Sequence, residues 1–438
     1  MSDSSQYDVA VVGGGPAGLM AAIAAGGRGR RVVVIEQLDR LGARLLATGG
    51  GRCNLTNTRP INDFLAAYGR QGRFAQPALE ALSPAALRAL LADLGVATVE
   101  DGWQVYPATH KALTVQSALV SAARGVGAEL RTSAPATGLL VEAGRVAGVR
   151  TAAGAVAARA VIIACGGRSY PALGGTGGGY ELARQAGHEI VEPTPALVPL
   201  IARERWPARC AGVSAAARVW VDLAAGPAAA LTKADRARLS RAMCYPGGTA
   251  GDVLFTHRGL SGPAVLDLSG DVAGLLAALG EVTLRLDLAG GGRATATAQA
   301  AWVRNFERWQ QQAGRRSLRP MLAEHVPAAL ASVLCELANI DGGIRLAQVP
   351  LDRRRLLAEL LTHLPVTITQ TEGWERASVT RGGVSLREVE PRTLASRRVP
   401  GLFLAGEVLD IDGPCGGWNL QWAFASGFLA GSNAGAAQ

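Results

Sequence analysis

The sequence predicts an α/β fold in which a three-layer domain is interrupted by a β-barrel-like insert and an α-helical insert. Three observations support this architecture. A glycine-rich turn follows the first apolar run, two later apolar runs also end in glycines, and the chain between them changes from short strands to a helical period. The length of 438 residues allows two or three domains at about 100 to 200 residues each.

Composition favours a globular chain that is not secreted. Hydrophobic residues make up 49% of the sequence and charged residues 18%, which excludes disorder over most of its length. No basic stretch precedes the first apolar run, and no later run approaches the roughly 18 residues needed to cross a bilayer. The six cysteines show neither CxxC nor CxxH spacing. We therefore expect a cytoplasmic protein with no disulfide framework, no metal and no membrane partner.

The net charge is basic, at +9. Such a charge can attract phosphates, RNA or acidic substrates. Only Lys111 and Lys233 are lysine, however, and the abundance of arginine, alanine and glycine is typical of GC-rich codon usage. The arginines are spread along the chain, with short clusters at 28–31, 315–319 and 353–355. Charge alone therefore favours a compositional origin, and RNA stays a second candidate partner.

The first element is a buried parallel strand that runs into a glycine turn. The apolar run 7–12 leads directly to a GxGxxG pattern formed by Gly13, Gly15 and Gly18. In such a motif the first glycine makes the tight turn, the second lets a pyrophosphate approach the backbone, and the third lets the helix pack on the strand.

A helix and a second strand complete this unit. Small residues form the helix 17–25, and the strand 31–35 ends at Glu36. The helix N-terminus faces the phosphates, and a carboxylate at this position accepts hydrogen bonds from both adenosine ribose hydroxyls while repelling a 2′-phosphate. The unit therefore predicts a Rossmann-like domain that binds NAD or FAD.

The next elements belong to the same domain. The polar, glycine-dense stretch 48–57 can lie against a flat ring system, because glycine allows close approach. Ser83-Pro84 opens a helix that stops at Gly95. Asp101-Gly102 then predicts a two-residue hairpin turn between strands 96–100 and 103–106.

The middle of the chain carries the inserts. A buried strand, 160–164, ends in glycines, and after the proline-rich stretch 192–195 the chain turns to short strands. We expect these strands at 197–201, 217–223, 253–257 and 281–288. A helical period follows from residue 296, and 365–370 is expected to be a returning strand. The side chains expected to form the helical core are Trp302, Phe306, Trp309, Leu330, Val333, Leu334, Leu337, Leu357, Leu360, Leu361 and Leu364.

The last elements return to the first domain. The chain rejoins it through 382–384, and the strand 401–405 ends at a glycine and an acid, Glu407. A helix over 420–430, starting from Gly417, would point its N-terminal N–H groups at an electron-rich acceptor such as the N1 and O2 edge of a reduced flavin. A cofactor held by both ends of the chain is long, which favours FAD.

These motifs resemble the aminoacetone-oxidase-like (BaiN/RdsA) family of FAD-dependent oxidoreductases, which are glutathione-reductase-type flavoproteins. The resemblance rests on VVGGGPAGLMAA, TGGGRCNLTN, ACGGRSYPALGGTGGGYELARQAGH, FTHRGLSGPAVLDLS and VPGLFLAGEVLDIDGPCGGWNLQWAFASG, so it spans almost the full chain. It implies a Rossmann-like FAD-binding domain in two halves, 1–193 and 373–438. Between them it implies a β-rich insert over 194–295, with a returning strand near 364–372, and a helical insert over 296–363.

The resemblance also implies where non-covalent FAD lies. The diphosphate would lie at 13–18, the ribose at Glu36, the ribitol near Glu407, and the ring against 52–54 and 417–419. The residues predicted to bind the cofactor are Gly13, Gly15, Pro16, Ala17, Gly18, Glu36, Gln37, Arg44, Gly50, Gly51, Arg52, Cys53, Asn54, Ala136, Cys165, Gly166, Gly167, Gly406, Glu407, Asp412, Gly417, Trp418 and Asn419.

Two side chains are candidates for catalysis. Cys53 would donate a proton to a substrate carbon or else be a small packed thiol beside the ring. His257 would orient substrate from the insert or else be structural. Trp418 would flank the flavin or else be a core anchor.

The redox partners and the substrate have open alternatives. No second GxGxxG follows a strand, so either NAD(P)H docks transiently at the flavin or oxygen reoxidises it. The resemblance implies a small amine or aminoketone, or an activated C=C bond, as substrate, including uridine in ribosomal RNA. An RNA-modifying flavoenzyme and a flavin-binding factor without turnover are the alternatives to an enzyme of small molecules.

Overall fold

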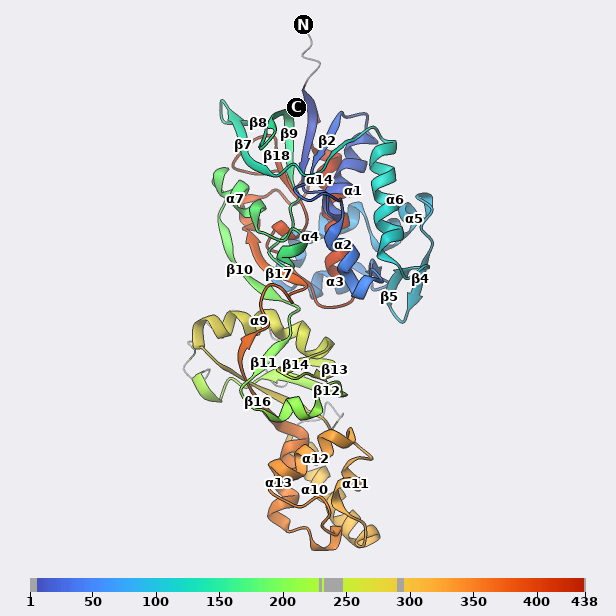
Figure 1. The fold of residues 1–438 in the computed structure, drawn as a ribbon, viewed down its shortest axis with the longest axis vertical. Helices are drawn as coiled ribbons and strands as arrows, with labels where there is room; N and C mark the ends of the chain where they lie inside the picture. Colours follow the sequence, from blue (N-terminus) through green and yellow to red (C-terminus); the bar gives the residue numbers. More distant parts are fainter. Residues whose placement is uncertain (1–5, 228–230, 232–246, 290–294, 437–438) are drawn as a thin grey trace. The chain divides into compact units, whose positions relative to one another are not determined.

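The chain forms two compact units in a computed structural model that describes residues 6–227, 231, 247–289 and 295–436 (Figure 1). The first unit comprises residues 1–194 and 377–438, and the second comprises 195–376. The predicted fold class is confirmed: a Rossmann-like domain, a closed barrel and a set of helices are all present. No helix in the described part of the chain is both long and apolar enough to span a bilayer.

A seven-stranded sheet forms the centre of the first unit. Its order is β6-β2-β1-β9-β8-β7, with β18 paired to β9. The strands β6, β2, β1, β9 and β18 are parallel, and Val9 pairs with both Val32 and Ala160. The bounds are β1 Tyr7–Val12, β2 Val32–Ile35, β6 Glu129–Arg131, β7 Ala136–Glu142, β8 Arg145–Thr151, β9 Gly154–Ile163 and β18 Leu402–Leu404. Continuous apolar runs suit such strands because helices cover both faces of a parallel sheet.

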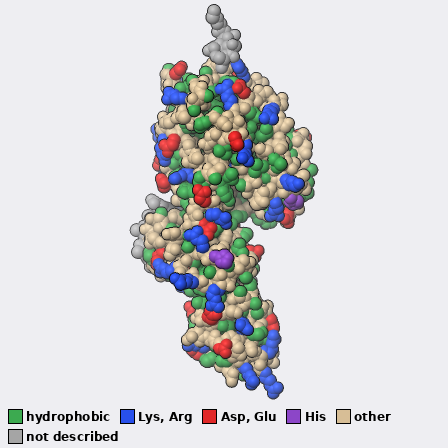
Figure 2. Space-filling view, viewed as in Figure 1, with side chains coloured by type: hydrophobic (Ala, Val, Ile, Leu, Met, Phe, Trp, Pro, Cys, Tyr) green, Lys and Arg blue, Asp and Glu red, His purple; other side chains and the backbone are tan. Residues whose placement is uncertain are grey.

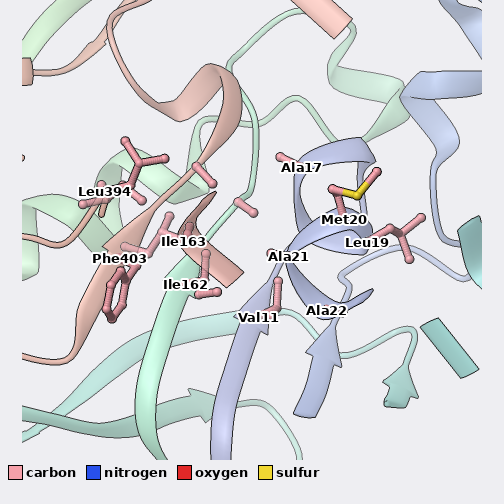
Figure 3. Close-up of a cluster of buried hydrophobic side chains, with 14 of the residues drawn as sticks. Val11, Ala17, Leu19, Met20, Ala21, Ala22, Ile162, Ile163, Leu394 and Phe403 are labelled. Atoms are coloured by element: carbon pink, nitrogen blue, oxygen red, sulfur yellow. The ribbon is translucent and has the colours of Figure 1, made fainter. Parts of the chain in front are cut away.

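Two helices from opposite ends of the chain pack closely beside this sheet. They are α1 (Pro16–Gly26) and α14 (Trp418–Asn433). A Cβ atom at Gly427 would overlap the carbonyl oxygen of Ala17, and one at Gly431 would overlap that of Ala21. The glycines therefore let the two backbones touch. Figure 3 shows the apolar side chains of α1 and the sheet strands in this core.

The remaining helices of the first unit range from five residues in α2 to 14 residues in α6. Ser83 caps α5, since its Oγ accepts the Ala86 N–H at 3.2 Å, and Gly95 follows with φ +79°, as predicted. The bounds are α2 Ala43–Ala47, α3 Ile61–Ala67, α4 Gly72–Ala81, α5 Pro84–Asp93, α6 Ala112–Gly125 and α7 Gly178–Gln185.

The predicted hairpin is present, but its turn is shifted by one residue. Asp101 of β4 (Thr98–Asp101) pairs with Gln104 of β5 (Gln104–Pro107), so the loop is Gly102-Trp103 rather than Asp101-Gly102. Gly102 has φ +60° at the first loop position, which is the type II′ pattern rather than the type I′ pattern that Asp-Gly suggests. The strand β3 (Thr56–Asn57) joins the other edge of β5.

The proline-rich stretch is a strand. It lies within β10 (Ile190–Ala196), which forms a two-stranded sheet with β17 (Val379–Val384). Proline is tolerated on an edge strand because its missing N–H can face away from the partner.

A six-stranded closed barrel forms the first part of the second unit. The strand order is β11-β14-β13-β12-β15-β16. The predicted returning strand closes it, since β16 pairs with both β15 and β11. The helix α9 (Pro263–Leu279), which begins after the N-cap Gly262, was not expected in this insert of short strands. The strand bounds are β11 Leu200–Ala202, β12 Ser214–Val221, β13 Thr249–Phe255, β14 Gly259–Ser261, β15 Val282–Asp287 and β16 Leu364–Thr371.

Helices fill the chain between β15 and β16. Nine of the eleven predicted core positions are buried, as the helical period indicates, but Trp309 is only partly buried and Leu364 begins β16 instead of lying in a helix. Leu337 differs, being 40% exposed, because α12 ends at this residue. The bounds are α10 Thr295–Ala313, α11 Leu318–Leu322, α12 Ala328–Leu337 and α13 Leu351–His363.

A buried histidine joins three segments of the first unit. The ring of His188 is completely buried, with Nδ1 3.1 Å from Oε2 of Glu388 and Nε2 2.8 Å from Oγ of Ser396. Burial lowers the pKa of His188, and the nearby Glu388 carboxylate opposes this shift. The folded protein therefore holds this ring in its neutral form.

We expect His188 to make the protein less stable in mild acid. The unfolded chain binds a proton at this ring near pH 6.5, and the folded chain binds it only at lower pH. The contribution of the neutral ring to the free energy of unfolding is present above about pH 6.5. It is lost as the pH falls towards the lowered pKa of His188. Thermal midpoints between about pH 7.5 and about pH 5.5 should fall more steeply for the native chain than for His188→Gln. Parallel slopes would contradict the assignment.

Candidate active site

The glycine turn after β1 leaves open space at one position. Gly13 has φ +106°, and a Cβ there would lie 2.5 Å from the carbonyl oxygen of Ala164. A Cβ at Gly18 would overlap the carbonyl oxygen of Gly13. At Gly15, in contrast, a Cβ would meet nothing within 4 Å. Gly15 is the N-cap of α1, and Pro16 begins that helix. This open space at a helix N-terminus fits the predicted diphosphate.

The carboxylate of Glu36 is fixed at the end of β2. Its Oε2 accepts the N–H of Gly14 at 2.7 Å, and its Oε1 accepts the N–H of Leu38 at 2.9 Å. Each oxygen retains acceptor capacity, which suits the predicted ribose hydroxyls. The chain just before Ala136 lies beside it, because the Ala134 N–H donates to the Glu36 carbonyl. The neighbouring Gln37 instead donates to the Gly174 carbonyl at 2.8 Å.

Replacing Glu36 by alanine is expected to weaken FAD binding by a factor of about ten or more. The variant loses two acceptors for the ribose, each worth about 1.5 to 3 kcal/mol for a charged group before compensation. Titration of the FAD-free protein with FAD measures the change. Unchanged affinity would show that the adenosine end lies elsewhere.

A second carboxylate, that of Glu407, gathers donors from three segments. Its Oε2 accepts from Arg44 Nη2 at 2.5 Å, and its Oε1 accepts the Thr380 N–H at 2.6 Å. Ser169 Oγ lies 3.4 Å from Oε1. The predicted residues Gly166 and Gly167 belong to this cluster, since a Cβ at these positions would overlap the side chains of Arg44 and Thr380 respectively. The glutamate directly follows Gly406, and Cys165 directly precedes Gly166.

The glycine-dense loop has the backbone that its sequence predicts. Gly49, Gly50 and Gly51 have φ of +57°, +65° and +86°, a left-handed region that favours glycine. The guanidinium of Arg52 lies over the ring of Tyr106, 5.0 Å from its centroid. Three successive residues without side chains therefore leave this backbone open to close approach.

Cys53 is buried next to this loop. Its side chain has no exposed surface, and burial raises its pKa to about 12. The thiol therefore keeps its proton, and its complete burial favours the packed role over the catalytic one, which stays a prediction.

The loop also meets the start of α14. Gly417 caps the helix with φ +83°. The Asn54 amide, in the orientation that satisfies both of its groups, accepts the Gly417 N–H at 3.2 Å and donates to the Thr56 carbonyl at 3.0 Å. The structure thus brings together the two segments expected to face the ring.

Trp418 and Asn419 hold this region from within. The Trp418 ring lies edge-on to Phe64 at 4.5 Å and is tilted towards Trp103 at 5.8 Å, so it is a core anchor. The Asn419 amide exchanges two hydrogen bonds of 2.8 Å with the backbone of Gly413. Their side chains therefore shape the loop, and a role in touching the cofactor stays a prediction.

A pair of acids lies in the loop after Glu407. Asp412, predicted to bind the cofactor, is held by Arg381, with Nη2 3.0 Å from Oδ2 and Nε 3.2 Å from Oδ1. Asp410 is partly buried. Burial, followed by the negative charge of Asp412, raises the pKa of Asp410, while Gln71 and Arg381 act in the other direction. Asp410 is not among the site residues predicted from the sequence, although two acids spaced two apart in GEVLDIDG mark this position.

His257 lies at the exposed bend between β13 and β14. It belongs to the second unit, whereas the other predicted site residues belong to the first. Its role stays a prediction.

Comparisons with known proteins cover nearly the whole chain. A family model described as HI0933-like protein Rossmann domain matches residues 7–433. A 3-dehydro-bile acid delta(4,6)-reductase of Clostridium scindens is 32% identical over 429 residues, covering 97% of this chain and 98% of that protein. A ribosomal RNA dihydrouridine synthase of Escherichia coli is 29% identical over 436 residues, covering 96% of each.

Solved structures share the fold at low identity. A 3-ketosteroid delta1-dehydrogenase from Sterolibacterium denitrificans matches with a TM-score of 0.52 and 14% identity, covering 99% of this chain and 100% of that chain. At this identity the match supports the architecture alone.

Proposed function

Because the chain belongs to the HI0933-like Rossmann-domain family, we propose that it reduces a carbon–carbon double bond conjugated to a carbonyl group. It is an FAD-dependent oxidoreductase, and the residues of the first unit fit this cofactor. The open space at Gly15, the fixed carboxylate of Glu36 and the junction of Asn54 with Gly417 are the observations of that fit.

The similarity to the Clostridium scindens reductase carries the proposal. Its name describes a 3-keto substrate with double bonds at positions 4 and 6, and a 4-ene is conjugated to a 3-ketone. The Escherichia coli relative is named for dihydrouridine, in which the double bond conjugated to the C4 carbonyl of uracil is reduced. The two names share this chemistry, and neither describes a small amine.

The reaction adds a hydride to one carbon and a proton to its neighbour. Bound FAD supplies the two electrons, which a nicotinamide cofactor would restore by transient docking. The protein must orient the substrate and deliver the proton. We infer that Asp410 is this proton donor, since it is partly buried in the loop that joins Glu407 to the start of α14, the two segments expected to face the cofactor. Burial also raises its pKa, which suits an acid.

Ribosomal RNA is the second candidate substrate. The similarity to the Escherichia coli enzyme over 96% of each chain favours it. On the face shown in Figure 2, however, basic side chains are scattered and interleaved with acidic ones rather than gathered in one patch. A nucleic-acid surface usually gathers them, so this face adds no support to RNA beyond the similarity.

An anaerobic two-step experiment tests the proposal. The holoprotein is first reduced with NADH or NADPH, and loss of the flavin absorbance is followed. The reduced protein is then mixed with a steroid 4-en-3-one, with a ribosomal RNA fragment, or with air. Reoxidation by the enone with formation of the saturated ketone is expected. Reoxidation by RNA with formation of dihydrouridine would favour the second candidate, and reoxidation by air alone would overturn both.

A further inference from the structure

Thr380 links three segments around the Glu407 carboxylate. It lies on β17 and its side chain is almost completely buried. Its Oγ1 accepts the N–H of Arg168 at 2.8 Å and that of Ser169 at 3.3 Å, while its own N–H donates to Glu407 at 2.6 Å. One residue therefore fixes both the loop after β9 and the glutamate after β18.

The loop held by Thr380 in turn contacts the same carboxylate. Ser169 Oγ accepts from Arg44 Nη2 at 2.6 Å, and Arg44 is paired with Glu407. The Gly167 N–H lies 3.4 Å from Glu407 Oε2. Gly167 must lack a side chain because a Cβ would overlap Thr380 Oγ1. The closed network leaves the Glu407 side chain 18% exposed, with a donor on each carboxylate oxygen.

We propose that Thr380 is a positioning residue for FAD, acting through the 166–169 loop and Glu407. The inference rests on FAD as the cofactor and on the ribitol lying near Glu407, and it is independent of the substrate. Without the Thr380 hydroxyl, the N–H groups of Arg168 and Ser169 lose their common acceptor. The loop then no longer aligns Glu407 for a ribitol hydroxyl.

FAD affinity and protein stability, measured separately, test this role. Thr380→Val keeps the shape of the side chain and removes the acceptor, so the dissociation constant for FAD is expected to rise about tenfold, the effect of one net hydrogen bond. Thr380→Ser keeps the hydroxyl and should bind FAD as the native chain does. The matched control is Thr362→Val in α13, since Thr362 is equally buried and bonds its Oγ1 to the Ala358 carbonyl at 2.9 Å.

Titration of each FAD-free protein and its thermal midpoint give the two readouts. The proposal requires weaker FAD binding in Thr380→Val alone, with restoration in Thr380→Ser. Equal weakening in Thr362→Val, or native affinity in Thr380→Val, would overturn it. If Thr380→Val does not fold, Ser169→Ala removes the next contact of the network and must weaken FAD binding instead. Tight FAD binding without turnover of an enone would affect only the substrate proposal.

Discussion

Replacing Gly15 by valine is expected to weaken FAD binding by about 100-fold or more while leaving the FAD-free protein as stable as the native chain. Gly15 has φ −77° and ψ −173°, which any residue adopts, and a Cβ there meets nothing within 4 Å. The protein alone therefore has open space where the side chain begins. The diphosphate does not, because it needs this space to reach the backbone N–H groups at the start of α1.

Two further variants separate this effect from a general loss of structure. Gly125→Val, at the end of α6, also adds its Cβ in open space and should change neither property. Gly18→Ala should lower both affinity and thermal stability, because its Cβ overlaps the Gly13 carbonyl. Native FAD affinity in Gly15→Val would place the diphosphate elsewhere.

Asp410→Asn is expected to slow reoxidation of the reduced flavin by an enone about 100-fold or more, the usual effect of losing a general acid. Asparagine preserves the shape of the side chain but has no acidic proton. Reduction by a nicotinamide should stay nearly unchanged, because the proton is needed only in the step with substrate. The native rate of that step should fall as the pH rises through the raised pKa of Asp410, since the protonated form is then lost.

Cys53→Ser is the comparison variant for this test. The Cys53 side chain has no exposed surface, so we expect small and similar changes in both steps. A 100-fold loss confined to the substrate step in Cys53→Ser would restore the catalytic role predicted from sequence. Native rates in Asp410→Asn would end its assignment, and His257→Gln would be the next variant to measure.

The nucleotide-binding unit could be predicted closely from the sequence because steric limits fix its glycines. The strand 7–12, the turn at Gly13 to Gly18 and the acid at Glu36 all occur as expected. The hairpin turn was displaced because Gly102 occupies the first loop position. Local sequence patterns predict a strand or a turn well when the steric limits that fix it involve only a few neighbouring residues.

The partners of Glu407 could not be predicted in the same way. Arg44, Ser169 and Thr380 come from distant parts of the chain, and only the return of β17 to the first unit brings them together. Trp418 shows the same limit, since its edge-on packing against Phe64 could not be read from the sequence, and its predicted place beside the ring stays a prediction. Asp410 could not be singled out from the sequence, because its raised pKa depends mainly on burial. The local sequence Asp410-Ile411-Asp412 does not show which residues are buried.

The close packing of α1 against α14 has a consequence for how the protein is made. Gly427 and Gly431 rest on the backbone of Ala17 and Ala21, yet the ribosome adds α14 roughly 400 residues after α1. The nucleotide-binding unit therefore stays incomplete through most of synthesis, with the apolar surface of α1 uncovered. The barrel unit, whose strands are all made before β17, can finish first. We expect nascent chains to depend on chaperones until α14 emerges, and FAD to be captured only after that moment.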